Sequence, residues 1–286
     1  GDVYKRQVLW IKGMNASQEK RWLQFCRDYV PVKDSDGRFL LEARWTDKEN
    51  ERRNLAVIRY GDTIKRYDLT LFNSIYLNRE KGTYSAIWQQ YAAVMCALLC
   101  NTDAETSQAF MDTCDFTAEE PIIGMRKIAA DGAYLRRAES SNLHILSLVR
   151  KESISAIDAQ IWKAQLQVLF PLLEIERVSF IKRYRKQVQE ALGEKYHDFR
   201  TGRSQYIYQF GETVSDPDNA ELGTIYRMTK LRRDADAYQY LLYIPDEQSR
   251  SRIELLHDLR NSLAHGNTCA IDKVIEFING HPFDWN

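Results

Sequence analysis

Three side chains near the C-terminus have the types and the spacing needed to cleave a phosphodiester without a metal ion. Arg260, Asn261 and His265 lie in the segment Arg-Asn-Ser-Leu-Ala-His. Imidazole groups titrate near neutral pH and suit proton transfer, and a guanidinium offers fixed paired donors to a phosphate. RNA carries its own nucleophile, the ribose 2′-hydroxyl, so a catalyst must only move protons and stabilise the charge on phosphorus. These residue types are therefore able to cleave RNA, and Asn261 can orient either of the other two by hydrogen bonding.

One predicted helix must position these residues. Asp246 follows a proline and is a good N-cap, and Gly266 stands where a left-handed C-cap is expected. The apolar residues between them recur at spacings of three and four, which predicts a core-facing stripe. They are Ile253, Leu256, Leu259 and Leu263. Asn261 and His265 share a face of such a helix, and Arg260 lies about 140° around the axis from His265. All three are therefore predicted to border the exposed side.

The same pattern also has a structural explanation. A histidine that ends a helix before a glycine interacts favourably with the last carbonyl groups and with the negative end of the helix dipole. An arginine five residues before a histidine is a short pattern that arises by chance in many proteins. Spacing alone therefore leaves both roles open for Arg260 and His265. We expect His257, two turns earlier, to be structural.

The segment 259–266 resembles the Arg-Asn-x-x-Ala/Val-His form of the Arg-x4-6-His motif found in HEPN domains (higher eukaryotes and prokaryotes nucleotide-binding). The resemblance covers roughly residues 150–280 and depends mainly on this motif. The helix start at 221–223 and the long apolar helix before it support the resemblance. The family is all-helical, and its active members include CRISPR-associated ribonucleases, toxins of toxin–antitoxin pairs and other defence effectors. Two protomers usually face each other, so that both Arg/His pairs line one cleft.

This resemblance implies that Arg260 and His265 are catalytic and that Asn261 supports them. It implies a metal-independent endoribonuclease without a cofactor, acting on single-stranded RNA as a homodimer in a defence or toxin setting. An upstream sensor or NTPase module, or an antitoxin, would be its partner. The alternative is a non-catalytic helical module that uses the same helix for dimerisation or nucleotide binding within a larger, N-terminally truncated defence or NTPase protein.

The charge of the chain limits how RNA would be bound. The formal net charge is zero, and residues 151–286 hold 18 Lys and Arg against 20 Asp and Glu. No domain-wide positive field would attract nucleic acid, so any contact must be local. One basic cluster is a candidate for phosphate contacts. It consists of Lys182, Arg183, Arg185 and Lys186. Glu174 and Glu176 lie near it in sequence, and a solvated helix face with local ion pairs is the competing interpretation. Similarly, Tyr206, Tyr208 and Phe210 alternate as in a base-stacking platform or a packed strand.

Composition favours a cytoplasmic globular protein. The chain has 286 residues, of which 44% are hydrophobic and 28% charged, and no apolar run reaches the roughly 20 residues of a membrane span. Five scattered cysteines without a secretory signal favour reduced thiols. Cys96 and Cys100 lie one helical turn apart without further ligands at zinc spacing, so we expect buried side chains and no metal site. Phosphate-loop, dinucleotide, serine-hydrolase and zinc-protease motifs are absent.

We predict a mainly α fold, in which a C-terminal HEPN-like helical bundle follows a small α+β region with a short antiparallel sheet. Residues 1–7 resemble a translated sequencing-library adapter, which would place the natural start upstream. The predicted divisions are a small α+β region at 8–82, a helical connector at 83–150 and the HEPN-like domain at 151–286.

Hydrophobic periodicity and turn residues predict the individual elements. Asn15 and Gln18 form a capping-box pattern before a first helix. The predicted strands are Phe39–Trp45, Leu55–Tyr60 and Thr63–Leu71. The predicted helices are Tyr84–Cys100, Asp103–Thr113, Glu120–Ala130, Tyr134–Lys151, Ser155–Leu192, Ala220–Arg233, Ala235–Tyr243, Asp246–His265 and Ile271–Asn279. Pro171 makes the Ser155–Leu192 helix either kinked or divided. The stretch Gly193–Asp218 is expected to be a long loop.

Overall fold

The protein is described here from a computed structural model covering residues 8–30, 37–43, 51–52, 55–58, 63–131 and 144–283. The adapter-like residues 1–7 lie outside this part of the chain. The chain divides into two compact units, residues 1–65 and residues 66–286. The predicted boundaries near residues 82 and 150 both fall inside the second unit. Within the described residues, no helix has the length and apolar character needed to cross a membrane.

The first unit is a strand–helix–strand arrangement. β1 (Val8–Ile11) is followed by α1 (Ala16–Asp28) and β2 (Arg38–Leu41). The predicted capping box is confirmed, since the Gln18 backbone N–H donates to Asn15 Oδ1 at 2.9 Å and the Asn15 N–H donates to Gln18 Oε1 at 3.0 Å. The aromatic side of α1 packs on β2. It consists of Trp22, Phe25 and Tyr29, which surround the ring of Phe39.

The sheet of this unit differs from the prediction. β1 and β2 pair in parallel, with Val8 opposite Arg38, and not as the expected antiparallel sheet. The pairing is parallel because α1 carries the chain back between the two strands, which is the connection that parallel strands need. The predicted strand at 55–60 contributes an isolated antiparallel bridge between Arg52 and Leu55, and its last two residues lie outside the described chain.

The second unit is helical, which confirms the predicted mainly α fold with a small α+β region. Its first half contains five helices of the described chain. They are α3 (Arg66–Glu80), α4 (Ala86–Cys100), α5 (Ala104–Thr113), α6 (Pro121–Ala130) and α8 (Ile145–Arg150). α3 replaces the predicted strand Thr63–Leu71. Leu69, Asn73 and Leu77 recur every four residues and are buried, so helical packing against α4 overrides the strand preference of the local sequence.

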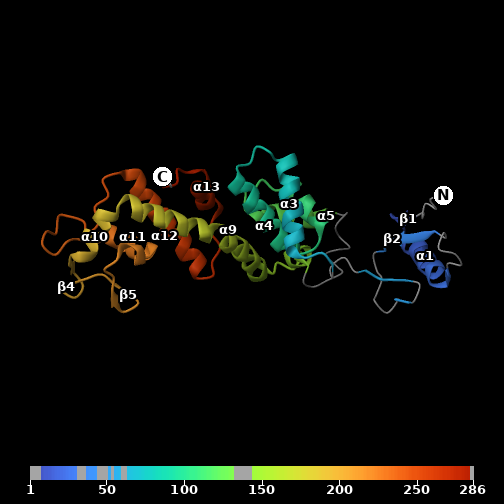
Figure 1. Cartoon of the computed structure of the whole chain (residues 1–286), viewed down its shortest axis with the longest axis horizontal. Helices are drawn as coiled ribbons and strands as arrows, with labels where there is room; N and C mark the ends of the chain where they lie inside the picture. The colour runs from blue at the N-terminus through green and yellow to red at the C-terminus, as the bar shows by residue number, and fades with distance from the viewer. Residues whose placement is uncertain are drawn as a thin grey trace, which may run out of the picture. The chain divides into compact units, whose positions relative to one another are not determined.

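The second half of this unit begins with the longest helix. α9 (Ile154–Arg183) continues through Pro171 and ends at Tyr184, where α10 (Arg185–Gly193) begins. Figure 1 shows α9 extending from the α3–α5 group to the α10–α13 group. The later helices are α11 (Leu222–Lys230), α12 (Glu247–Ala264) and α13 (Ile271–Asn279).

The predicted loop after α10 contains short ordered elements. They are β3 (Tyr196–Asp198), β4 (Arg203–Gln205), β5 (Tyr208–Gln209), β6 (Glu212–Thr213) and the 3₁₀ helix η3 (Pro217–Asn219). β3 pairs with β4 and β5 with β6, both antiparallel. The predicted helix Ala235–Tyr243 is wrong. Tyr240 instead bridges Arg232, and Arg233 bridges Tyr196, so pairing with a distant strand determines this segment.

One apolar core runs through the second unit and joins its two halves. α4 is buried along nearly its whole length and packs on both α3 and α9. Polar contacts also link the halves: Trp88 Nε1 donates to Asn279 Oδ1 at 2.7 Å, and the Ile271 N–H donates to Glu120 Oε1 at 2.9 Å. The helices at 83–150 therefore share a core with those that follow.

Adding a methyl group at Gly124 of α6 is expected to lower the free energy of unfolding by about 1–3 kcal/mol. A Cβ at this position would lie 2.6 Å from the Cβ of Cys114 and 3.0 Å from a ring carbon of Phe110, both buried. Gly223→Ala in α11 is the matched control, because a Cβ there meets open space. It should be neutral or slightly stabilising. Urea unfolding compares the two variants, and a Gly124→Ala protein as stable as wild type would contradict this packing.

Candidate active site

α12 begins and ends as its sequence predicts. The Ser249 backbone N–H donates to Asp246 Oδ2 at 2.9 Å, which confirms the N-cap. Gly266 has a φ of +78°, and the Asn267 N–H donates to the Ser262 carbonyl at 2.9 Å, which closes the C-terminal turn. The apolar stripe is buried as predicted. It consists of Ile253, Leu256, Leu259 and Leu263. The helix end that carries the candidate residues is therefore held rigidly.

Asn261 and His265 lie together on the exposed end of α12. Both are exposed, and the His265 backbone N–H donates to the Asn261 carbonyl at 3.1 Å. His265 is the C-cap residue, with φ −92° and ψ 9°. The end of α12 is anchored by Trp162 of α9, whose Nε1 donates to the Leu263 carbonyl at 2.8 Å. His265 thus stands exposed at a helix end that is packed on α9.

Arg260 points in a different direction, toward α9 and α11. Its side chain is 26% exposed, and Nη2 donates to Glu221 Oε2 at 3.0 Å. Glu221 is the residue that precedes the first turn of α11, and it makes no side-chain capping bond there. The ion pair was not anticipated, because the two residues are 39 positions apart and no local pattern links them.

A cavity of about 370 Å³ opens beside Arg260. Its lining combines carboxylates, guanidinium groups and one aromatic ring. The lining residues are Phe170, Glu174, Arg177, Gln209, Asp218, Asn219, Glu221 and Arg260. Arg177 is held by Glu174 at 2.8 Å and by the Asp218 and Ala220 carbonyls at 3.1 Å each. His265 is not part of this lining, so Arg260 and His265 lie on different sides of the helix.

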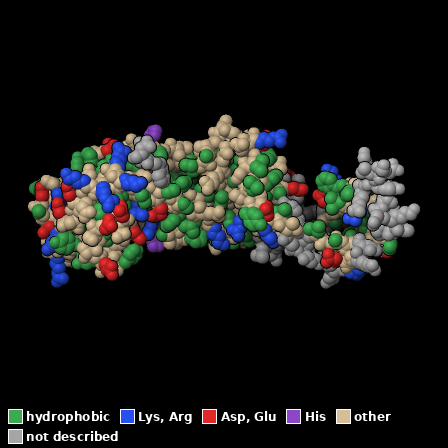
Figure 2. Space-filling model, viewed as in Figure 1, with side chains coloured by type: hydrophobic (Ala, Val, Ile, Leu, Met, Phe, Trp, Pro, Cys, Tyr) green, Lys and Arg blue, Asp and Glu red, His purple; other side chains and the backbone are tan. Residues whose placement is uncertain are grey.

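Two members of the predicted basic cluster, Arg185 and Lys186, form ion pairs with nearby carboxylates. Arg185 makes a bidentate pair with Asp218 at 2.7 and 3.0 Å, and this pairing holds the pKa of the Asp218 carboxyl below its ordinary value. Lys186 lies 3.9 Å from Glu190. Lys182 and Arg183 are exposed at the end of α9. Figure 2 shows Lys and Arg side chains interspersed with Asp and Glu over the α10–α12 end of the visible face. Phosphate contact there would be local.

His257 is engaged in contacts within the fold. Its ring stacks on Tyr226 with centroids 4.1 Å apart and planes 14° apart. Nδ1 lies 3.4 Å from Asp258 Oδ1, and Asp258 also binds Lys273 Nζ at 2.6 Å. These contacts hold α11, α12 and α13 together, and they leave His265 as the exposed histidine of α12.

The cysteines of the second unit are unsuited to act as nucleophiles. Burial raises the pKa of the Cys114 and Cys269 thiols to about 12 and raises the pKa of Cys96 and Cys100 well above the ordinary value. A thiol of this kind is not ionised at neutral pH, and the thiolate is the reactive form. Among the described residues, no group of three or more His, Cys, Asp and Glu is placed to hold a metal ion.

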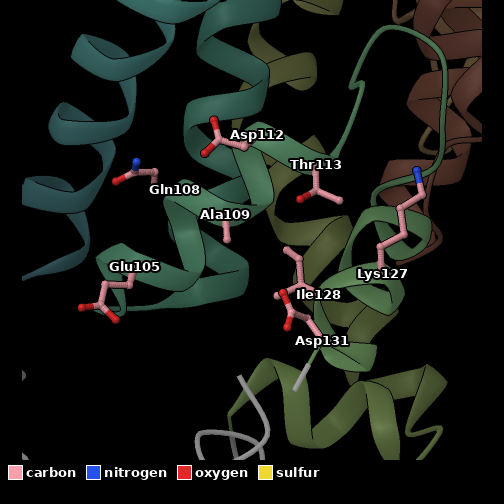
Figure 3. A pocket seen from close by; sticks show the side chains of 8 residues that line it. All are labelled: Glu105, Gln108, Ala109, Asp112, Thr113, Lys127, Ile128 and Asp131. Atoms are coloured by element: carbon pink, nitrogen blue, oxygen red, sulfur yellow. The ribbon is translucent and has the colours of Figure 1, made fainter. Parts of the chain in front are cut away.

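A larger cavity, of about 530 Å³, lies between α5 and α6 (Figure 3). Its polar walls include Glu105, Gln108, Asp112, Lys127 and Asp131. The side chains of Glu105 and Lys127 point away from one another in Figure 3. Lys127 is bound to Glu119 at 2.9 Å. The cavity lining contains neither histidine nor cysteine, so α12 is the better candidate site for proton transfer near neutral pH.

Comparisons with known proteins do not add to this assignment. No protein-family model, no curated protein and no solved structure matches the chain.

Proposed function

We propose that this protein is a metal-independent endoribonuclease of the HEPN type, which cleaves single-stranded RNA by attack of the ribose 2′-hydroxyl. The observation that carries the proposal is the C-terminal end of α12, where Asn261 and His265 are exposed and Arg260 borders a cavity. The resemblance of this segment to the Arg-x4-6-His motif gives the residues their roles. A defence or toxin setting follows from the same resemblance.

Each residue has a defined task in this reaction. The 2′-oxygen forms a bond to phosphorus while the bond from phosphorus to the 5′-oxygen breaks. His265 transfers protons, and Arg260 neutralises the charge that develops on the phosphoryl oxygens. The products are a 2′,3′-cyclic phosphate and a 5′-hydroxyl. Arg260 has five N–H donors, so it can contact a phosphate while Glu221 holds Nη2.

A homodimer would resolve the separation of Arg260 and His265. About 140° of helix rotation and roughly 7.5 Å of rise separate two residues five positions apart. Two copies of α12 facing each other would present two arginines and two histidines to one cleft. The proposed enzyme is therefore active as a dimer. Because the domain has no broad positive charge, the reacting phosphate must be held by the arginines of this cleft.

The substrate requirement tests the proposal directly. The purified protein is incubated in EDTA with single-stranded RNA, with the same sequence as DNA and with 2′-O-methyl RNA. Only the RNA should be cut, and its fragments should end in 2′,3′-cyclic phosphate. Arg260→Ala and His265→Ala should both lose this activity. Equal cleavage by all three proteins, or none at dimer-forming concentrations, would contradict the proposal.

The Arg260–Glu221 ion pair favours a second candidate, a non-catalytic helical module. In that case Arg260 fastens α12 to α11, and the exposed helix end serves dimerisation or nucleotide binding. Such a module would bind a nucleotide or a second copy without cutting RNA. Glu221→Ala would then weaken dimerisation as much as Arg260→Ala does, which sedimentation analysis measures.

A further inference from the structure

The two-stranded antiparallel sheet of β3 and β4 follows α10, and an isolated antiparallel bridge joins it to the segment 232–240 that follows α11. Tyr196 of β3 pairs with Gln205 of β4 on one side and with Arg233 on the other. Arg232 in turn pairs with Tyr240. The Asp234 N–H donates to the Lys195 carbonyl at 2.9 Å, and the Arg233 N–H donates to the Gln239 carbonyl at 3.0 Å. Gly193–Asp218, expected to be a loop, therefore contains paired strands, one of which is bridged to the segment after α11.

The register of these pairs determines which side chains share a face. Residues directly opposite one another lie on the same face, and successive residues alternate. Tyr196 is buried, and its hydroxyl accepts from Arg227 Nη2 at 2.7 Å, so its side faces the protein. The other side is the outer face. It carries Lys195, His197, Tyr206, Arg232, Asp234 and Tyr240. Phe199 continues this face at the turn after β3 and is 73% exposed.

A cation lies over one face of each of two tyrosine rings on the outer face. Lys195 Nζ is 5.2 Å from the centre of the Tyr206 ring, and the guanidinium carbon of Arg232 is 3.6 Å from that of Tyr240. Both tyrosines are 39% exposed. Rings that stack bases, with cations next to them for the phosphates, are the combination that binds single-stranded nucleic acid.

His197 and Asp234 add a polar group to the same face. The His197 ring lies 4.8 Å from that of Phe199, and its Nδ1 lies 3.5 Å from Asp234 Oδ1. A carboxylate among the rings is unfavourable for insertion into lipid, where it would lose its hydration. It is compatible with nucleic-acid bases, whose amino groups are donors. The chemistry of the face therefore favours RNA over a membrane surface.

The outer face also lies close enough to the candidate site on α12 for one RNA strand to contact both. α11 begins at the residue after Glu221, the partner of Arg260, and ends at Lys230, two residues before Arg232. Nine helical residues span about 14 Å, so a strand of a few nucleotides can reach from one to the other. Figure 1 shows α10, β4 and α11 at the same end of the second unit as α12.

We infer that the outer face binds single-stranded RNA and holds the substrate strand for cleavage at α12. The identity of the ligand as RNA rests on the proposed ribonuclease function. Tyr206 and Tyr240 stack on bases with the ring faces that Lys195 and Arg232 do not cover, and these two cations contact the adjoining phosphates. Specificity for single strands follows, because paired bases do not offer their faces for stacking.

Binding to a labelled RNA tests this inference separately from cleavage. A fluorescein-labelled oligouridylate of twelve nucleotides is titrated in EDTA with the His265→Ala protein, and anisotropy gives the Kd. Tyr206→Ala and Tyr240→Ala should each raise the Kd by about 5- to 150-fold, the range expected for loss of one stacked base. Tyr206→Phe and Tyr240→Phe keep the ring and should bind nearly as wild type. Tyr67→Ala, at a tyrosine of α3 that is 73% exposed, is the control and should not change the Kd.

The outcomes separate the two proposals. If RNA binding needs both rings but the wild-type protein does not cleave RNA, the outer-face inference is supported and the ribonuclease proposal is overturned. If the wild-type protein cleaves RNA but neither alanine substitution changes the Kd, the outer-face inference is overturned and the ribonuclease proposal stands. Absence of RNA binding, or binding instead to vesicles of anionic phospholipid, also overturns the outer face. Circular dichroism of each variant establishes that it is folded.

Discussion

Arg252→Ala is expected to lower the free energy of unfolding by about 3–5 kcal/mol, the largest single-residue effect on stability that we predict. Arg252 of α12 and Glu176 of α9 form an ion pair in which the side chains are only 7% and 6% exposed. Nε donates to Glu176 Oε2 at 2.8 Å, and Nη2 donates to Glu176 Oε1 and, at 3.0 Å, to the Phe277 carbonyl of α13. The guanidinium thus joins three helices, and its removal leaves a buried carboxylate without its counter-charge.

Two further variants identify the cause of this loss. Glu176→Leu combined with Arg252→Met removes both charges and should cost much less than Arg252→Ala, since no buried charge is left unpaired. Lys186→Ala breaks a pair on the surface and should change the free energy of unfolding by less than about 1 kcal/mol. Urea unfolding followed by circular dichroism measures all of them. An Arg252→Ala protein as stable as Lys186→Ala would show that the pair does not support the fold.

The sequence predicts α12 well because the signals that define this helix are local. The cap at Asp246, the apolar stripe and the turn at Gly266 all lie within the helix or at most two residues beyond it. The capping box at Asn15 is predicted for the same reason. The exposed position of Asn261 and His265 follows from the stripe, because residues off the stripe on this helix face outward.

Predictions fail where distant segments determine the local conformation. The segment 63–71 has strand-forming residues, yet the burial of Leu69 against α4 makes it helical. The segment 235–243 has a helical pattern, yet Tyr240 pairs with Arg232, which is itself next to a residue paired with β3. The N-terminal strands are parallel because of the helix between them, which strand propensity does not reveal.

At the candidate site, too, the sequence reveals the residues but not their contacts with distant segments. Residue types and spacing single out Arg260, Asn261 and His265, but they do not indicate that Arg260 turns toward Glu221. The basic residues where α9 meets α10 are evident in the sequence, whereas the pairing of Arg185 with Asp218 depends on where η3 lies. Ion pairs between separate elements are a property of tertiary packing, and they determine which cations are available to a substrate.

His265→Ala is expected to reduce the rate of RNA cleavage by about 10²- to 10⁴-fold, the usual contribution of a general acid or base. The proton of the 2′-hydroxyl must leave as the bond to phosphorus forms, and the exposed imidazole at the end of α12 is the group proposed to transfer it. Arg260→Lys should also be impaired, since an ammonium keeps the charge but not the planar pair of donors. Single-turnover cleavage of a labelled RNA in EDTA measures both rates.

The His265→Ala effect should be specific to catalysis, because the side chain is exposed and its loss leaves the buried stripe of α12 intact. The free energy of unfolding should therefore change by less than about 1 kcal/mol. His281→Ala removes another exposed histidine, outside α12, and should cleave RNA at the wild-type rate. A His265→Ala protein that is folded, dimeric and fully active would assign the imidazole to capping the helix and remove it from the proposed reaction.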